Sequence, residues 1–274
     1  MPDISASVLR KGIKEVVLHP GILPYAMKHS EKEVMVRLKQ LESLRLTPKA
    51  AFHNDSILQH FLLSSLDFFR VVTFFEAGTF RGDSVIWLAD KVQNIKTISC
   101  ESEEYFYKRT LRRLSRIRMD DRVRLINKSS PMAIKECFES GLLQEPALFW
   151  LDAHWNEYWP LTDELKEILR CCKSSILVID DFKVPNNPQL EYDTYNGIEN
   201  SLEYISPLFH SNSANVQLDF LFPNYDNSQL VTKSKFRPRG YVAIFLGLRR
   251  GLQQFETKFE DLSKNFIHKV GQDF

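Results

Sequence analysis

The sequence predicts an α/β protein built on a doubly wound sheet of seven strands, mostly parallel, with the last strand antiparallel. Two observations predict this fold. From residue 71 onward, short apolar runs alternate with amphipathic helical stretches, and strands that are apolar on both faces belong in a parallel sheet covered by helices. The last two apolar runs follow each other without a helix between them, which indicates an antiparallel pair at one end of the sheet.

The composition limits the classes of protein that remain. The chain has 274 residues and a net charge of +1, with 36 Lys and Arg against 35 Asp and Glu. This balance argues against a nucleic-acid partner, because dedicated nucleic-acid binders carry a basic excess. The 20 Phe residues supply apolar surface for a core, which excludes a wholly disordered chain. The four cysteines lack metal-ligand spacing and are expected to be free thiols.

We expect a cytoplasmic protein with no membrane partner. No apolar stretch approaches the length of about 20 residues that a membrane-spanning helix needs, and the N-terminal sequence lacks the apolar core of a signal peptide. Residues 1–70 are expected to form an N-terminal helical cap. Within it, Ser30 and Glu33 form a capping box, and Val34, Leu38 and Leu41 follow at helical spacing.

The central domain is expected to span residues 71–248. Its predicted strands cover 71–76, 95–101, 123–127, 147–152 and 175–180, with helices near 83–92, 103–118, 131–139 and 161–171. A loop at 182–193, a helix at 195–205 and two strands at 216–222 and 241–248 are expected to follow. Strands that alternate with helices form right-handed crossovers, so the predicted sheet is Rossmann-like.

A single amphipathic helix is predicted for residues 249–274. Its apolar residues are spaced three and four apart, at Leu252, Phe255, Phe259, Leu262 and Phe266. This spacing forms one apolar stripe along a helix. Packing on the protein's own N-terminal helices is the favoured interpretation, and a homodimer through the terminal helices is the alternative.

Every expected strand of the parallel sheet ends on polar residues. They are Glu76, Glu101, Asn127, Asp152 with His154, and Asp180 with Asp181. Ligands of such sheets bind outside the carboxyl ends of the strands, where strand order reverses. Asp and Asn also fill turns, but so many of them at one edge predict a binding site.

The loop after the first strand reads Ala-Gly-Thr-Phe-Arg-Gly-Asp-Ser, residues 77–84. Gly78 and Gly82 permit a tight turn and a close approach of the backbone to a ligand. Glu76 before the first glycine disfavours a nicotinamide dinucleotide, because a carboxylate gains nothing beside a pyrophosphate. It suits a cofactor with a positive group. Glu101, 25 residues after Glu76, can accept both hydroxyls of a ribose.

With these residues the sequence resembles the class I S-adenosylmethionine-dependent methyltransferases over roughly residues 70–248. The resemblance implies that the loop binds the methionine end of the cofactor, that Glu101 binds the ribose, and that residues 128–130 lie near the adenine. The implied cofactor-binding residues are Glu76, Gly78, Thr79, Phe80, Arg81, Gly82, Ser84, Glu101, Ser102, Lys128, Ser129, Ser130 and Asp152.

A narrower resemblance rests on Phe149-Trp-Leu-Asp152-Ala-His154 and Ile179-Asp180-Asp181-Phe. These segments are similar to the metal-dependent sugar and macrolide O-methyltransferases of the macrocin O-methyltransferase type. The resemblance implies that Asp152, Asp180 and Asp181 hold Mg²⁺ or another divalent metal, because Mg²⁺ prefers oxygen ligands. His154 stands where an acidic residue is common, and histidine favours Mn²⁺, Fe²⁺ or Zn²⁺. Alternatively, the Asp pair caps a helix or pairs with a nearby Arg or Lys.

The favoured function is S-adenosylmethionine-dependent methylation of a hydroxyl on a small-molecule or saccharide acceptor. Asp152 and His154 are the expected catalytic residues, with His154 as base, metal ligand or supporting residue. Nearby Trp155, Tyr158 and Trp159 are expected either to stack on the acceptor or to anchor their loop. Two alternatives stay open: an RNA methyltransferase that uses the basic helix 103–118, and a non-catalytic binding or scaffold protein that keeps the fold.

Overall fold

The computed structural model describes residues 51–154, 158–212, 217–226, 228–230 and 238–271. The chain forms two compact units, Met1–Pro48 and Lys49–Phe274, and the described residues all belong to the second. Most of the expected N-terminal cap, including the capping box of Ser30 and Glu33, therefore lies outside the described residues. Among the described helices, none is long and apolar enough to cross a membrane.

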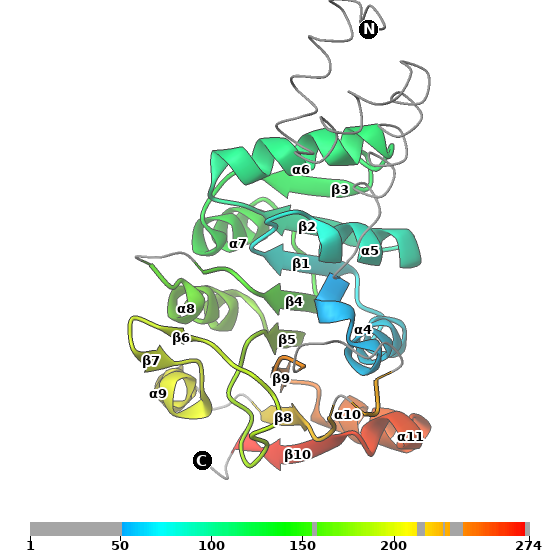
Figure 1. Ribbon diagram of the computed structural model, residues 1–274, viewed down its shortest axis with the longest axis vertical. Coiled ribbons are helices and arrows are strands. Elements are labelled where there is room, and N and C mark those ends of the chain that lie inside the picture. The colour runs from blue at the N-terminus through cyan, green and yellow to red at the C-terminus, as the bar shows by residue number, and fades with distance from the viewer. Residues whose placement is uncertain (1–50, 155–157, 213–216, 227, 231–237, 272–274) are drawn as a thin grey trace, which may run out of the picture. The chain divides into compact units, whose positions relative to one another are not determined.

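The described unit is built on one large mixed sheet (Figure 1). Its strand order is β10-β8-β9-β5-β4-β1-β2-β3. The strands are β1 (Thr73–Ala77), β2 (Lys96–Cys100), β3 (Val123–Ile126), β4 (Ala147–Leu151), β5 (Ser175–Ile179), β8 (Leu218–Pro223), β9 (Val242–Leu246) and β10 (Phe266–Val270). The first five are parallel, and β9 pairs antiparallel with both β5 and β8. The predicted doubly wound α/β sheet is confirmed, with eight strands instead of seven.

The central strands are buried on both faces, as the apolar runs predict. Successive side chains of a strand point to opposite faces. Phe75 therefore packs in the core on one face, together with Phe149, while Phe74 packs in the core on the other face, together with Trp150. A strand of this kind is stable only when helices cover both sides.

Helices cover both faces of the sheet (Figure 1). One face carries α7 (Ser130–Glu139), α8 (Leu161–Cys171) and α9 (Leu202–Asn212), whose apolar residues join the Phe75 core. The other carries the short helix η1 (Ala51–Asn54), α4 (Ser56–Phe68), α10 (Arg249–Lys258) and α11 (Glu260–Ser263). Between β1, β2 and β3, α5 (Asp83–Lys91) and α6 (Glu104–Arg116) form a third apolar cluster. All four cysteines are free and buried.

The predicted helix 195–205 is wrong in its first half. Residues Thr194–Tyr195 and Ile198–Glu199 form a two-stranded hairpin, β6 and β7, and α9 begins only at Leu202. The turn between them is Asn196-Gly197, and both residues have positive φ values of 53° and 78°. An Asn-Gly pair in this conformation is the favoured two-residue hairpin turn, so the signal was present in the sequence.

The single C-terminal helix is also corrected. The chain bends at Phe259, which separates α10 from α11, and it then enters β10. Leu252, Phe255 and Leu262 are buried against α4 and the sheet, as the stripe predicts. Phe266 instead belongs to β10, which pairs antiparallel with β8 and adds the eighth strand. The apolar stripe therefore packs within its own chain.

Strand order reverses between β1 and β4, since β1 continues to β2 on one side and β4 continues to β5 on the other. Crossover connections leave a crevice at such a point, outside the carboxyl ends of the strands. The polar residues that follow β1, β2, β4 and β5 meet at this edge of the sheet.

Candidate active site

A cavity of about 630 Å³ opens at the carboxyl ends of the strands beside this reversal. Its volume lies within the range of small-molecule sites. Residues that follow four successive strands of the sheet line it: Gly78, Phe80, Cys100, Glu101, Ser102, Glu103, Phe106, Lys128, Ser130, Asp152, Ala153 and His154. Eight of these residues are predicted cofactor-binding or catalytic residues.

The glycine loop lies directly against the end of β4. Gly78 has a φ of +88°, and a Cβ atom at this position would lie 2.6 Å from the carbonyl oxygen of Asp152. Only glycine tolerates both the left-handed backbone and this contact. The first glycine of the loop is therefore required for its close packing on β4, at the wall of the cavity.

Glu76 lies beneath the loop rather than on the cavity wall. It is 2% exposed, and its carboxylate accepts a hydrogen bond from Ser99 Oγ, which is also bonded to Thr79 Oγ1 at 2.5 Å. Burial raises the pKa of Glu76 to about 8, against the opposing effect of the Ser99 hydrogen bond. This arrangement joins the loop to β2, and direct contact of Glu76 with a cofactor stays a prediction.

Glu101 lines the cavity, and its carboxylate joins the loop after β1 to the segment after β2. One carboxylate oxygen accepts the N–H of Phe80 at 2.7 Å, and the other accepts the N–H of Glu103 at 2.9 Å. The Asn127 side chain donates to the Glu101 carbonyl at 2.7 Å and fixes this strand end. A carboxylate has about four acceptor sites, so Glu101 keeps two for a ligand in the cavity.

Aromatic residues form one wall of the cavity. The rings of Phe80, from the loop, and Phe106, from α6, lie 4.6 Å apart between centroids. Phe80 is 49% exposed, although its backbone amide is held by Glu101. Phe106 is a cavity residue that the sequence reasoning missed, because nothing in a helical stretch singles out one aromatic residue.

Several predicted cofactor-binding residues do not line the cavity. Ser84 Oγ accepts the backbone N–H of Phe52 at 3.2 Å. Arg81 lies over the ring of Phe80, with its guanidinium carbon 4.9 Å from the ring centroid. Gly82 and Ser129 are the residues that precede α5 and α7. Their predicted contacts with a cofactor remain predictions.

Buried carboxylates gather beside the cavity where β4 and β5 end. Asp180 and Asp181 are 3% and 5% exposed. Burial and the nearby charges of Asp180 and Asp181 hold the pKa of Asp152 well above its usual value. Burial and Asp180 raise the pKa of Asp181 to about 7, although Arg239 opposes this shift. Three acids this close resist simultaneous ionisation unless cations compensate them.

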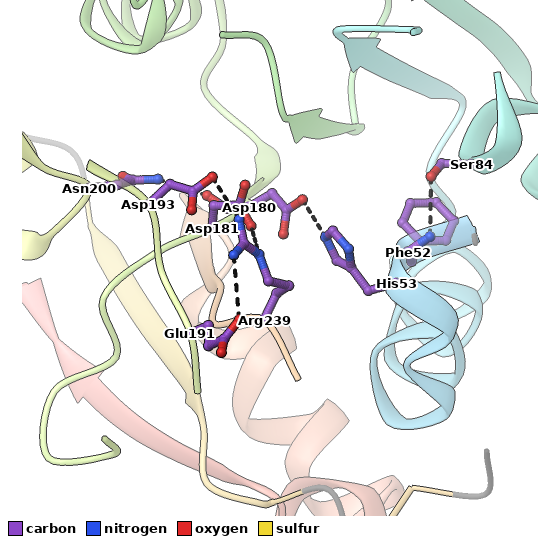
Figure 2. Close-up of polar contacts among 9 residues, drawn as sticks. All are labelled: Phe52, His53, Ser84, Asp180, Asp181, Glu191, Asp193, Asn200 and Arg239. Carbon is purple, nitrogen blue, oxygen red and sulfur yellow. Dashed lines mark hydrogen bonds and ion pairs between the residues drawn. The ribbon is translucent and has the colours of Figure 1, made fainter. Parts of the chain in front are cut away.

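Two such cations come from segments that the sequence reasoning missed (Figure 2). His53 Nε2 lies 2.6 Å from Asp180 Oδ2. Burial lowers the pKa of His53, but the charge of Asp180, its hydrogen bond and the charge of Asp181 together outweigh this effect and raise the pKa to about 9. Arg239 Nε donates to Asp181, while its Nη2 lies 2.6 Å from Asp193 Oδ2. Asp180 and Asp181 therefore each face a protein cation.

The predicted magnesium ligands do not fit that ion well. Two groups bring ligand atoms within 4.8 Å of one another: His53 with Asp180 and Asp181, and Asp152 with His154 and Asp181. The predicted trio is thus divided between two groups, each with a histidine, whereas Mg²⁺ favours oxygen ligands. Asp180 and Asp181 also already hold charged hydrogen bonds. The metal site stays a prediction.

The structure resembles solved methyltransferases in fold. An O-methyltransferase from Bacillus cereus in complex with SAH is 16% identical, with a TM-score of 0.49 over 81% of this chain and 93% of that one. The O-methyltransferase TomG from Streptomyces achromogenes, in complex with SAM, is 18% identical, with a TM-score of 0.45 over 69% and 79%. Neither a family model nor a curated protein matches the sequence. Likeness at this level concerns the arrangement of the chain and assigns no chemistry to it.

A second aromatic group lies beside His154. The His154 and Tyr195 rings are 5.1 Å apart, Tyr195 is 4.8 Å from Trp159, and Trp159 stacks on Tyr204 at 4.3 Å. Trp155 lies outside the described residues, and Tyr158 donates to Asp163 at 2.6 Å. The hairpin β6–β7 thus contributes Tyr195 to a row of aromatic rings next to the carboxylates.

The basic helix is partly occupied by contacts within the chain. On α6, Arg113 Nη1 lies 2.6 Å from both the Arg81 carbonyl oxygen and Asp83 Oδ1. Lys108 pairs with Glu104 at 2.5 Å. Because these basic side chains pair within the chain, α6 offers less positive charge to a phosphate backbone than its number of Lys and Arg residues suggests.

Proposed function

We propose that this protein transfers a methyl group from S-adenosylmethionine to a hydroxyl of a small-molecule or saccharide acceptor. The observation that carries the proposal is the position of Glu101. It directly follows β2, lines the cavity at the strand reversal, and holds the backbone of the glycine loop through Phe80. A carboxylate at this point is suited to bind the two hydroxyls of a ribose.

The charge of the site supports a cationic cofactor. Glu101 and Asp152 line the cavity, and Glu76 lies beneath its loop. S-adenosylmethionine carries a sulfonium and an ammonium group, which the Glu101 carboxylate attracts and whose positive charge favours the ionised forms of Asp152 and Glu76. Phe80 and Phe106 add an aromatic wall, whose negative ring faces favour a neighbouring cation.

In the proposed reaction, the acceptor oxygen attacks the methyl carbon in line with the carbon–sulfur bond, which breaks and leaves S-adenosylhomocysteine. The hydroxyl proton passes to Asp152 or His154, both of which line the cavity. Burial and the nearby aspartates raise the pKa of Asp152, which makes its ionised form a stronger base. The protein contributes mainly alignment of the two reactants and removal of this proton.

The aromatic surface beside His154 supports a flat acceptor. Tyr195 lies tilted against Trp159, which stacks on Tyr204, and this row of rings begins at His154 beside the carboxylate cluster. Rings of this kind pack against the apolar face of a sugar or an aromatic compound. The acceptor hydroxyl would then lie toward Asp152 and His154.

The test is binding of S-adenosylhomocysteine, measured by titration calorimetry. Glu101→Gln should weaken binding by about 10- to 100-fold, because hydrogen bonds to a charged group contribute about 1.5–3 kcal/mol. Glu104→Gln is the matched control, since Glu104 is exposed and pairs with Lys108 on α6. Undetectable binding to the wild type, or equal binding to the Glu101 variant, would contradict the proposal.

A scaffold protein that keeps the fold makes the opposite prediction. It would show neither saturable binding of S-adenosylhomocysteine nor methyl transfer to a panel of phenols and sugars. Methyl transfer to RNA, with binding that falls steeply as salt rises, would instead support the RNA alternative.

A further inference from the structure

Two protein cations stand against the aspartates that follow β5 (Figure 2). His53 Nε2 is 2.6 Å from Asp180 Oδ2, and Arg239 Nε donates to Asp181 Oδ1. These partners come from positions 127 and 58 residues away in the sequence. Neither contact is a local turn or helix cap, so each depends on the fold.

The position of His53 is fixed by its neighbours. Phe52 on one side is 1% exposed and packs edge-on against Trp87 and Trp150. Its N–H donates to Ser84 (Figure 2). On the other side, Asp55 caps α4 by accepting the N–H groups of Ile57 and Leu58, both at 2.9 Å.

The backbone at His53 is itself unusual. Phe52, His53 and Asn54 have φ values of 50°, 56° and 58°. Three successive non-glycine residues in the left-handed region persist only where surrounding contacts hold them there, and such residues gather at functional sites. This conformation directs the His53 ring to Asp180.

Arg239 is held equally firmly. Its neighbour Gly240 accepts the N–H of Phe182 at 2.8 Å and donates to Glu191 at 2.7 Å. A Cβ at Gly240 would lie 2.2 Å from the Phe182 carbonyl oxygen. The chain before β9 is therefore closely packed on the segment after β5. Arg239 bridges Asp181 and Asp193 from there.

Resting on the proposed methyl transfer, we propose that His53 and Arg239 take the place of a divalent metal in this site. They act as fixed counter-ions for Asp180 and Asp181, so that the protein needs no metal to bind its cofactor and acceptor. A divalent ion bound to these aspartates would lie close to the Arg239 guanidinium, which would repel it, and it would have to displace the hydrogen bond between His53 and Asp180.

The space beside Asp180 supports the same inference. Asp152, His154 and Asp180 line a cavity of about 10 Å³, which is the room that about one water molecule needs. Mg²⁺ usually keeps several of its waters. The second carboxylate oxygen of Asp180 is buried and has no partner among the described residues, and a single water in this cavity would satisfy it.

The experiment measures binding of Mn²⁺ alone to the full chain, by electron paramagnetic resonance and equilibrium dialysis. The wild type should show no stoichiometric site. His53→Gln combined with Arg239→Gln removes both positive charges and leaves side chains that are still polar. This double variant should bind Mn²⁺ at least about tenfold more tightly than the wild type.

The chain contains a matched control for the double variant. Asp219 is a buried carboxylate that also pairs with one arginine and one histidine, Arg249 at 3.0 Å and His268 at 3.2 Å. Arg249→Gln combined with His268→Gln removes an arginine and a histidine from a single aspartate and should leave Mn²⁺ binding as weak as in the wild type. If the double variant at the site does not fold, His53→Gln alone should still bind Mn²⁺ more tightly than the wild type.

The outcomes separate this inference from the proposed function. Stoichiometric Mn²⁺ binding by the wild type, or no gain in the folded variants, would overturn the inference. So would loss of methyl transfer in EDTA that Mn²⁺ restores. Binding of S-adenosylhomocysteine, measured on the same samples, should be unchanged by EDTA. If S-adenosylhomocysteine does not bind at all, the proposed function is wrong. The Mn²⁺ measurement would still decide whether His53 and Arg239 exclude a metal.

Discussion

At the scale of single residues, the buried carboxyl group of Glu76 gives folding a pH dependence. Its pKa is raised from 4.5 to about 8, chiefly by burial. Between these values the unfolded chain loses the proton while the folded chain keeps it. Stability from this group is therefore complete below about pH 4.5, falls as pH rises, and levels off above about pH 8. The full effect is at most about 5 kcal/mol, at about 1.4 kcal/mol for each pH unit.

Glu76→Gln should remove this part of the pH dependence. We expect the free energy of unfolding of the wild type to fall more steeply than that of the variant between pH 5 and 8, as measured by urea denaturation without ligand. Glu164 also has a pKa of about 8, but it titrates in both proteins, so the difference reports Glu76. Glu104→Gln serves as the control, and parallel curves for wild type and Glu76→Gln would contradict the prediction.

At the scale of elements, the packing of the glycine loop on β4 can be tested with two glycines. Gly78→Ala would place a Cβ 2.6 Å from the Asp152 carbonyl oxygen, whereas Gly141→Ala meets nothing within 4 Å. Both have positive φ, 88° and 69°, so each alanine suffers similar backbone strain of about 1–2 kcal/mol. We expect Gly78→Ala to lower the free energy of unfolding by about 1–3 kcal/mol more than Gly141→Ala does. It should also weaken S-adenosylhomocysteine binding. Equal losses in the two variants would refute the loop contact.

Strands of the parallel part were predictable to within one or two residues. Each is a short run that is apolar on both faces, and few other structures bury such a run. The amphipathic helices between them were predictable for the same reason, and α8 was predicted with the bounds that it has. The hairpin β6–β7 was missed because the apolar residues around it also suit a helix, although Asn196-Gly197 indicated a turn.

The C-terminal segment shows a limit of periodicity. Leu252, Phe255, Phe259, Leu262 and Phe266 satisfy a helical stripe, yet Phe266 lies in a strand. Pairing of β10 with β8 satisfies the backbone hydrogen bonds of a strand that would otherwise lie at the edge of the sheet. This pairing joins residues more than forty positions apart, and local spacing carries no information about it.

At the scale of the whole molecule, the sequence located the edge of the sheet where the site lies but only part of its contents. Residues that directly follow strands, such as Glu101 and Asp152, could be predicted, because strand ends of one direction meet at one edge. His53 and Arg239 could not be. They reach that edge from a short helix before α4 and from the chain that enters β9, and neither position is marked by a sequence motif.

The described unit should fail to fold if it is cut at the boundary predicted from the sequence. Residues 51–70 bury Phe52, Leu58, Phe61, Leu62 and Leu66, each no more than 3% exposed. At about 1.5–3 kcal/mol for each side chain, their loss matches the whole stability of a typical domain. A chain of residues 71–274 should therefore show no cooperative thermal transition by circular dichroism.

The control is a chain of residues 49–274, which retains η1 and α4 and corresponds to the compact unit. It should unfold cooperatively. A cooperative transition in the shorter chain, at a similar temperature, would show that η1 and α4 are dispensable for the core.

The reversed direction of β9 has a further consequence for recognising relatives of this protein. A parallel strand delivers to the site the residues that come after it, but a reversed strand delivers those that come before it. Arg239 stands three residues ahead of Val242, the first residue of β9, and the pairing of Val242 with Ile179 fixes this offset. Insertions between Asp181 and Arg239 would alter the distance between them in sequence without moving the arginine in space. A diagnostic signature for such an arginine should therefore be anchored to the start of the reversed strand, and not counted from the aspartate pair.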